Sequence, residues 1–237
     1  MGLPKINTVL YDLALPSSGE KIEYRPFLVK EEKILLMALE GQDDKEMIKA
    51  VKQIVTQCVT NKDFDINKLA MIDLEYLFLN IRGKAVGDVS KISFKHSCGE
   101  VVELDIDLTK VEIVKNENIS DLVNLTDDIM IRLSPPSIDT VIASTVGGKN
   151  QVDMVLEIVR ECLIEIIQGK DVFSAQDHTR EELDEFLNSL NSGQFQNIQN
   201  YYESLPKLRQ VITYTCPHCG KTETETLEGL ASFFASA

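Results

Sequence analysis

The sequence predicts an α+β fold in which β-hairpins form a zinc-ribbon-like unit around a mainly helical insert. Two stretches of alternating apolar and polar residues flank short turns that contain cysteine and glycine, one near the middle of the chain and one near its end. Elsewhere apolar residues recur at the spacing of amphipathic helices. Because no internal repeat or long linker interrupts the chain, we expect a single domain over residues 1–237.

The first sub-region, residues 1–29, is predicted to be an N-terminal β-hairpin. Thr8–Tyr11 and Lys21–Arg25 are typical of strands, and Pro16–Gly19 between them is a cluster of turn-forming residues. The chain then enters a helical sub-region.

Residues 30–83 are predicted to be helical. The first helix covers 30–40 and stops at Gly41, and the second covers 44–59 with apolar residues at helical spacing. A third helical region over 65–82 has a broad apolar surface.

Residues 88–107 and 208–226 are predicted to form the two hairpins of the zinc-ribbon-like unit. Each has a turn that ends in glycine, between two segments whose side chains alternate like those of paired strands. The strands are expected at 89–94, 101–106, 209–214 and 221–226.

Residues 108–207 are predicted to form the mainly helical insert. A capping box at Thr179–Glu182 opens one of its helices, and Ser137 is a candidate cap for a short one. The expected elements are a strand at 129–133 and helices at 151–168, 180–190 and 194–203, followed outside the insert by a short terminal helix at 227–234.

Composition predicts a folded, acidic protein. Apolar residues make up 43% of the 237 residues, enough for an ordinary hydrophobic core. The formal net charge of −14 makes nucleic acid a poor default partner and suits docking onto basic protein surfaces. The N-terminus lacks the pattern of a signal peptide, and no apolar stretch approaches the length of a membrane span, so we expect no membrane association. Five cysteines, two of them in a Cys-x-x-Cys unit, favour a reducing cytosol.

The strongest chemical signal is the run Cys216-Pro217-His218-Cys219-Gly220 at the tip of the last hairpin. A Cys-x-x-Cys turn places two sulfurs where a tetrahedral ion needs them, and a closed structural site needs two further ligands. The earlier hairpin offers His96 and Cys98 at its own tip. We therefore predict a structural zinc ion bound by His96, Cys98, Cys216 and Cys219. The usual spacing would put a cysteine at Lys95, so the position of His96 is the weakest part of this prediction.

Two alternatives to zinc binding remain open at the sequence level, an empty degenerate ribbon and a redox-active cysteine pair. Because redox motifs usually open a helix after a strand, the position between two strands favours metal. A site closed by four protein ligands leaves no position for substrate water, so it does not imply catalysis.

No other group of residues points to an enzyme. Cys58 and Cys162 lie on or beside apolar helix stripes and are expected to be ordinary buried thiols. His178 and His218 are expected in loops, and no nucleophile has a credible base. A metal-dependent hydrolase would need an open coordination position and a nearby acid–base group, and we find neither.

Four segments resemble the baseplate hub protein family of T4-like, contractile-tailed bacteriophages. They are the runs Glu23–Lys33, Asp73–Gly87, the paired turns with Cys98-Gly99 and Cys216–Gly220, and Gly229–Phe234. They are spread over most of the chain in the expected order. The chain departs from the family pattern at its first turn, where His-x-Cys replaces a cysteine pair.

The resemblance implies a non-enzymatic structural or assembly protein that binds other baseplate hub and tail proteins in a heteromeric assembly. It implies a place in the host cytoplasm during assembly and, for a retained subunit, in the tail baseplate of the virion. Arg25, Pro26, Phe27 and Phe233–Phe234 are candidate contact residues, with core packing as the alternative for the aromatic ones. The rival interpretation is a zinc-ribbon regulator of transcription or replication, against which the net charge argues.

Overall fold

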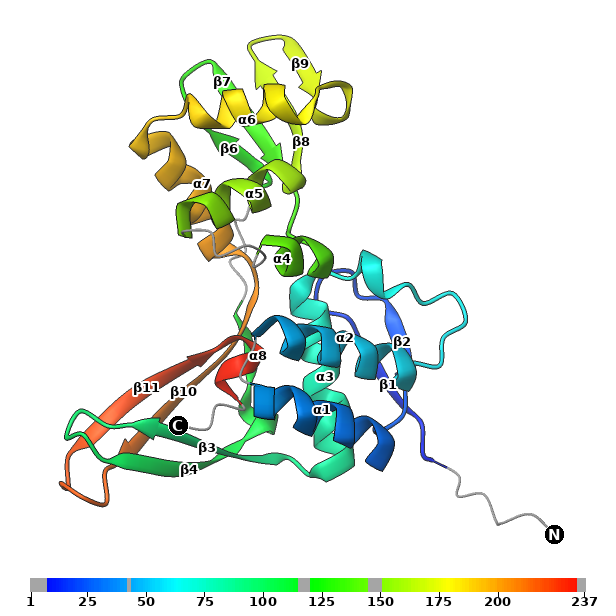
Figure 1. The fold of residues 1–237 in the computed structure, drawn as a ribbon, viewed down its shortest axis with the longest axis vertical. Helices are drawn as coiled ribbons and strands as arrows, with labels where there is room; N and C mark the ends of the chain where they lie inside the picture. The colour runs from blue at the N-terminus through cyan, green and yellow to red at the C-terminus, as the bar shows by residue number, and fades with distance from the viewer. Residues whose placement is uncertain (1–7, 42–43, 115–119, 145–150, 234–237) are drawn as a thin grey trace. The chain divides into compact units, whose positions relative to one another are not determined.

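The computed structural model describes residues 8–41, 44–114, 120–144 and 151–233. The chain divides into two compact units, one made of Met1–Val114 with Lys207–Ala237 and the other of Lys115–Pro206 (Figure 1). We call them the outer-sequence unit and the insert unit, and describe each by itself. That the chain is a single domain stays a prediction. Among the described residues, no helix has the length and apolar character needed to cross a membrane.

The outer-sequence unit begins with an antiparallel hairpin of β1 (Tyr11–Ala14) and β2 (Lys21–Tyr24). The first strand therefore starts three residues later than Thr8, where we predicted it. The turn explains this difference, because the backbone of Leu15 exchanges hydrogen bonds with Gly19 and Glu20 at 2.9 Å. Strand pairing starts directly beside that tight turn, with Ala14 opposite Lys21.

Three helices follow the hairpin, α1 (Val29–Gly41), α2 (Asp44–Cys58) and α3 (Met71–Val86). The helical prediction for residues 30–83 is confirmed in outline, although the third region divides into a 3-10 turn at Ile66–Lys68 and α3. Apolar side chains of α2 and α3 form much of the core: Ile54, Val55, Cys58, Leu74, Leu77, Phe78 and Ile81 are fully buried.

A buried ion pair fixes the start of α1. The carboxylate of Glu31 is inaccessible to solvent and accepts hydrogen bonds from Arg25 at 2.9 Å and from the backbone N–H of Leu28 at 2.8 Å. Arg25 also donates to the backbone carbonyl of Gln57 at 3.0 Å, at the end of α2. Burial opposes ionisation of Glu31, yet the hydrogen bonds from Arg25 and Leu28 outweigh it and lower the pKa of this carboxyl.

The two predicted zinc-ribbon hairpins are present as paired strands. β3 (Val89–Lys95) pairs with β4 (Val101–Asp107), and β10 (Lys207–Thr215) pairs with β11 (Thr222–Glu228). A short strand, β5 (Glu112–Val114), joins β10 to give a sheet of order β11-β10-β5. The unit ends with the single turn of α8 (Gly229–Ser232), shorter than the predicted terminal helix.

The hairpins share a hydrophobic core with α3 and the chain end. Its buried members are Ile72, Leu79, Ile92, Ile106, Leu108, Leu208, Leu227 and Phe233. The hydroxyl of Ser90 donates to the carbonyl of Phe233 at 2.8 Å and ties the end of the chain to β3. Phe27 and Phe233 are core residues, so our alternative of core packing is confirmed for them, and Phe234 lies outside the described residues.

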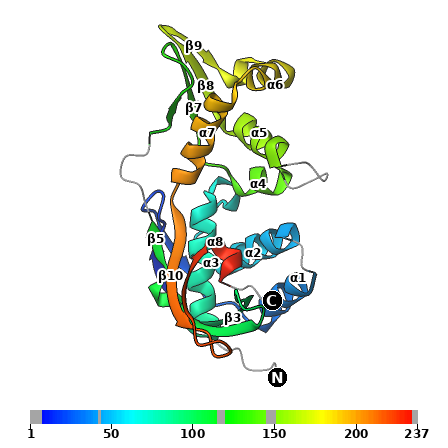
Figure 2. The ribbon, with the colours of Figure 1, turned by 90° about the vertical axis from the view of Figure 1, so that its left-hand side faces the viewer.

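The described residues of the insert unit form an antiparallel sheet of order β6-β7-β8-β9 and four α-helices. Helices α5, α6 and α7 lie beside this sheet (Figure 2). Their buried side chains share one core with Ile131 and Leu133. The strands are β6 (Leu122–Asn124), β7 (Ile129–Leu133), β8 (Leu163–Gln168) and β9 (Asp171–Ser174). The helices are α4 (Ile138–Ser144), α5 (Gln151–Cys162), α6 (Arg180–Asn188) and α7 (Ser192–Ser204).

The predicted helix over 151–168 is wrong in its last third. α5 ends at Cys162, and the following run to Gln168 is strand β8. Its isoleucines are β-branched, and Ile166 lies between Ile131 of β7 and Phe173 of β9. Strands β6 and β9 were not predicted either, so the insert is a mixed helix-and-sheet unit where we expected mainly helix. The capping box at Thr179–Glu182 is confirmed.

Candidate metal centre

The candidate centre lies where the turn of the β3–β4 hairpin meets the turn of the β10–β11 hairpin. In the first turn the N–H of Gly99 donates to the carbonyl of His96 at 2.8 Å, and in the second the N–H of Gly220 donates to that of Cys216 at 2.9 Å. Gly99 and Gly220 have φ angles of 94° and 74°, a region that favours glycine. The glycines therefore let each turn fold back on its first predicted ligand.

The hydrogen bonds also settle which residues correspond in the two turns. His96 accepts from Gly99 as Cys216 accepts from Gly220, so His96 corresponds to Cys216 in a turn one residue shorter. Lys95 ends β3 with an exposed side chain. His96 and Cys216 are buried, whereas Cys98 and Cys219 are exposed. The missing cysteine at position 95 is thus explained by the shorter turn.

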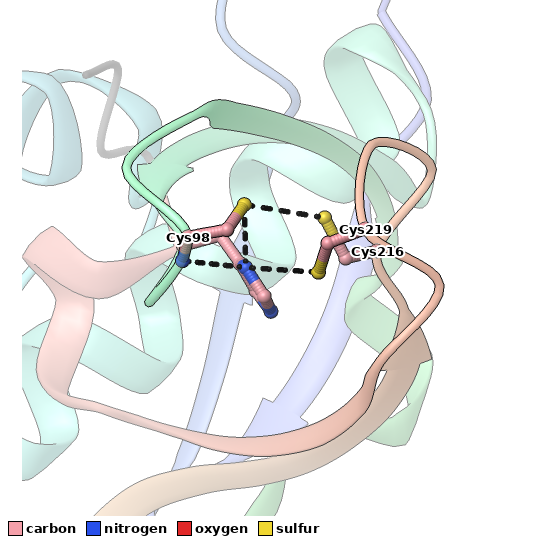
Figure 3. Close-up of side chains that lie close together, drawn as sticks. Cys98, Cys216 and Cys219 are labelled. Atoms are coloured by element: carbon pink, nitrogen blue, oxygen red, sulfur yellow. Dashed lines mark hydrogen bonds between the residues drawn. The ribbon is translucent and has the colours of Figure 1, made fainter.

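The four predicted ligands come together. Their ligand atoms all lie within 4.8 Å of one another. Cys98 Sγ lies 3.9 Å from Cys216 Sγ, and His96 Nδ1 lies 3.0 Å from Cys98 Sγ and 3.8 Å from Cys219 Sγ (Figure 3). Tetrahedral zinc with its usual bond lengths requires about 3.8 Å between two sulfurs and about 3.6 Å between sulfur and nitrogen. The Cys98–Cys216 and His96–Cys219 distances lie close to these values and the His96–Cys98 distance is shorter, so the cluster could hold a metal ion after a small adjustment.

Backbone N–H groups hydrogen-bond to the sulfurs of Cys98 and Cys216. Burial opposes ionisation of Cys216, but hydrogen bonds from the N–H groups of Cys219 and His218 outweigh it and lower the pKa of this thiol. At Cys98 the N–H of Glu100 favours the thiolate, while burial and the neighbouring thiols outweigh that effect and raise the pKa. Donors aimed at sulfur favour the thiolate form, which is the form that binds metals.

The ring of His96 is oriented by contacts on both of its nitrogens. Nδ1 faces the sulfurs and accepts from the backbone N–H of Cys98 at 3.1 Å, which assigns the ring proton to Nε2. Nε2 lies 2.9 Å from a carboxylate oxygen of Glu223, although the angle there falls outside hydrogen-bond geometry. The hydroxyl of Ser97 donates to the other oxygen of Glu223 at 2.6 Å. A carboxylate behind the distal nitrogen is the usual companion of a metal-binding histidine.

Comparisons with known proteins identify the family that the four segments resemble. The family model described as T4 bacteriophage base plate protein matches residues 8–235. The chain belongs to this family. It is also 25% identical over 218 residues to the baseplate hub assembly protein gp26 of Enterobacteria phage T4, covering 91% of this chain and 94% of that protein. No solved structure matches it. The family resemblance is confirmed, and the comparisons give no support to a regulator of transcription or replication.

In this base plate protein, an apolar wall lies behind the ligands. Tyr214 packs edge-on against Phe94, with ring centroids 5.1 Å apart, and against His96 at 5.9 Å. Val102 and Cys216 complete a small buried cluster with Tyr214. These contacts shield the inner side of the site from water.

The remaining candidate residues stand apart from the cluster. Cys58 and Cys162 are buried as expected, and burial raises the pKa of Cys58 to about 11. His178 lies 3.5 Å from Glu182 beside the capping box, and His218 is exposed in its turn. The residue that sequence reasoning missed is Glu223. Its position on β11, alternating onto the same face as Leu227, was the signal that could have identified it.

Proposed function

We propose that this base plate protein is a non-enzymatic assembly protein of a phage baseplate hub that acts by binding other hub and tail proteins. The observation that carries the proposal is the match, along nearly the full length of both chains, to a protein named as a hub assembly protein. The formal net charge of −14 favours basic protein surfaces as partners and disfavours nucleic acid. The proposed place of action is the host cytoplasm during assembly, with retention in the tail baseplate of the virion.

The proposal includes one structural zinc ion held by His96, Cys98, Cys216 and Cys219 as a zinc ribbon. Three sulfurs and one imidazole are a donor set that favours zinc over harder cations such as magnesium. Four protein ligands fill a tetrahedral shell and leave no position for a reacting water, in line with a non-enzymatic role. When bound, the ion supplies a cross-link and no reaction.

That cross-link joins segments that are far apart in the sequence. Cys98 and Cys216 are separated by 118 positions, with the whole insert unit between them. The chain leaves the outer-sequence unit after β5 and returns in β10, and Leu208 pairs with Ile113 at that point. Metal binding would add folding free energy to hairpins whose buried cluster at the turns is small.

The test is co-expression of the full chain with the other baseplate proteins of the same phage, followed by affinity capture and mass spectrometry. Metal content is measured on the same sample. We expect baseplate hub proteins to co-purify with about one zinc per chain. Recovery of hub proteins without zinc would contradict the metal site and still support the assembly role. Zinc with nucleic acid or polymerase in place of tail proteins would overturn the assembly role.

A further inference from the structure

The outward side of α1 is unusually apolar for a surface helix. Val29 is 80% exposed, Leu36 53% and Met37 64%, and Leu39 and the preceding Leu28 are exposed as well. The neighbouring helix α2 shows the usual pattern, since its exposed described side chains are all polar: Glu46, Lys49, Gln53, Thr56 and Gln57. A helix with apolar residues around most of its circumference is normally buried on all sides.

Four of these exposed side chains form one continuous stripe. Leu28 and Val29 lie at its start, and Leu36 and Leu39 follow, by way of Glu32, at intervals of three or four residues along one side of the helix. We call these four residues the α1 stripe. Ala38 and the carboxylate of Glu31 face the other way, into the unit, where α1 packs against α2. The stripe is therefore left over after α1 has made its own packing contacts.

We propose that the α1 stripe is the docking surface for a helix of another baseplate protein, with an apolar seam and one lysine or arginine opposite Glu32. This inference rests on the proposed assembly function and deepens it. Spacing at three and four residues is the pattern by which one helix packs along another. Because Glu32 lies between the residues of the α1 stripe, a partner must place a positive charge there to avoid burying an unpaired carboxylate.

Charge distinguishes this occupant from a second copy of the chain. Two copies would each bring a net charge of −14 and repel each other. A parallel pairing of two α1 stripes would also bring one Glu32 against the other. A partner with a basic residue in its seam meets neither penalty, so a heteromeric contact is favoured.

The experiment uses the full chain and a panel of probes, namely each other baseplate protein of the same phage, produced singly with a tag. Affinity is measured for the wild type, Leu36→Glu, Glu32→Lys and the control Val211→Glu. Val211 is matched because it is 55% exposed and lies on β10, away from the stripe. We expect Leu36→Glu and Glu32→Lys to weaken binding of one panel member at least about tenfold, and the control to change it less than about threefold.

The outcomes separate failure of this inference from failure of the proposed function. If the wild type binds a baseplate protein and both stripe variants bind it equally well, the inference is overturned and the assembly role stands. If no baseplate protein binds the wild type, both are overturned. A dimer of the free chain that Leu36→Glu dissociates would assign the stripe to a second copy. Slow amide exchange on the stripe side of α1 in the free chain, lost in Leu36→Glu, would assign it to the chain's own insert unit.

Discussion

The two units of the chain are stabilised in different ways. In the outer-sequence unit, polar contacts join distant segments: Ser17 donates to Asp73, Ser90 to the carbonyl of Phe233, and Ser97 to Glu223. In the insert unit, many polar contacts are local, such as the capping boxes at Thr179 and Asn191, and a single core packs sheet against helices. Both units therefore depend on hydrophobic burial, and in the outer-sequence unit polar contacts also join the hairpins to remote segments.

The segments that resemble the baseplate hub family all lie in the outer-sequence unit, and many of its cross-links involve them. Arg25 and Glu31 belong to the first run, Asp73 to the second, and the cysteines to the third. A substitution at one partner of such a contact leaves the other partner unsatisfied, often inside the protein. We therefore expect the largest effects of substitution in this unit.

The largest expected effect is that of Cys216→Ser. Loss of one ligand from a four-ligand site should abolish stoichiometric zinc binding, measured by chelator competition and metal analysis. Amide exchange should quicken at the tips of both hairpins and stay unchanged in the core of the insert unit. Cys58→Ala, which removes a buried thiol outside the cluster, should keep the zinc. Equal zinc content in Cys216→Ser and the wild type would contradict the proposed site.

Next in size is Glu31→Gln, which leaves Arg25 without its charged partner. Breaking a buried ion pair typically lowers the free energy of unfolding by about 3–5 kcal/mol. Because the folded pKa of Glu31 is lowered from 4.5, its contribution is present above pH 4.5 and is lost as the pH falls through the folded pKa. The difference between wild type and variant in urea unfolding should therefore shrink in acid. Glu40→Gln, on the exposed end of the same helix, should show no such difference from the wild type in urea unfolding.

Leu133→Ala tests the insert unit in the same assay. Leu133 is fully buried in the core between β7 and the helices, and removing such a side chain costs about 2–5 kcal/mol. The loss of unfolding free energy should be the same with and without a chelator, because this core contains no predicted metal ligand. A chelator-dependent loss would mean that the two units do not differ in the way described above.

The same division explains what could be predicted from the sequence. Local signals identified the capping box at Thr179, and the cysteine spacing identified Cys216 and Cys219 as a pair. Strand β8 was mistaken for helix because its short apolar run is compatible with the periodicity of a helix and of a strand. Its pairing with β7 and β9 decides between the two. The role of His96 in place of a cysteine at position 95 depends on the hydrogen bonds of a shorter turn, which spacing does not encode.

The smallest and most specific prediction concerns Glu223, which sequence reasoning missed because its partners lie on the other hairpin. Its carboxylate lies 2.9 Å from Nε2 of His96 and accepts a hydrogen bond from Ser97, so we expect it to help orient the ring in the proposed zinc site. Glu223→Gln should weaken zinc affinity by about 10–100-fold in chelator competition, the usual effect of removing such a partner.

Glu225→Gln is the matched control for this variant. Glu225 lies on the same strand two positions away, and it is exposed. Its substitution should leave zinc affinity unchanged. A nitrogen-15 spectrum of the zinc-loaded protein adds a readout that a general loss of stability would not give, since Glu223→Gln should shift the His96 ring nitrogens and Glu225→Gln should not. Equal affinities and spectra in the two variants would show that Ser97, the ligands and the turns orient His96 without Glu223.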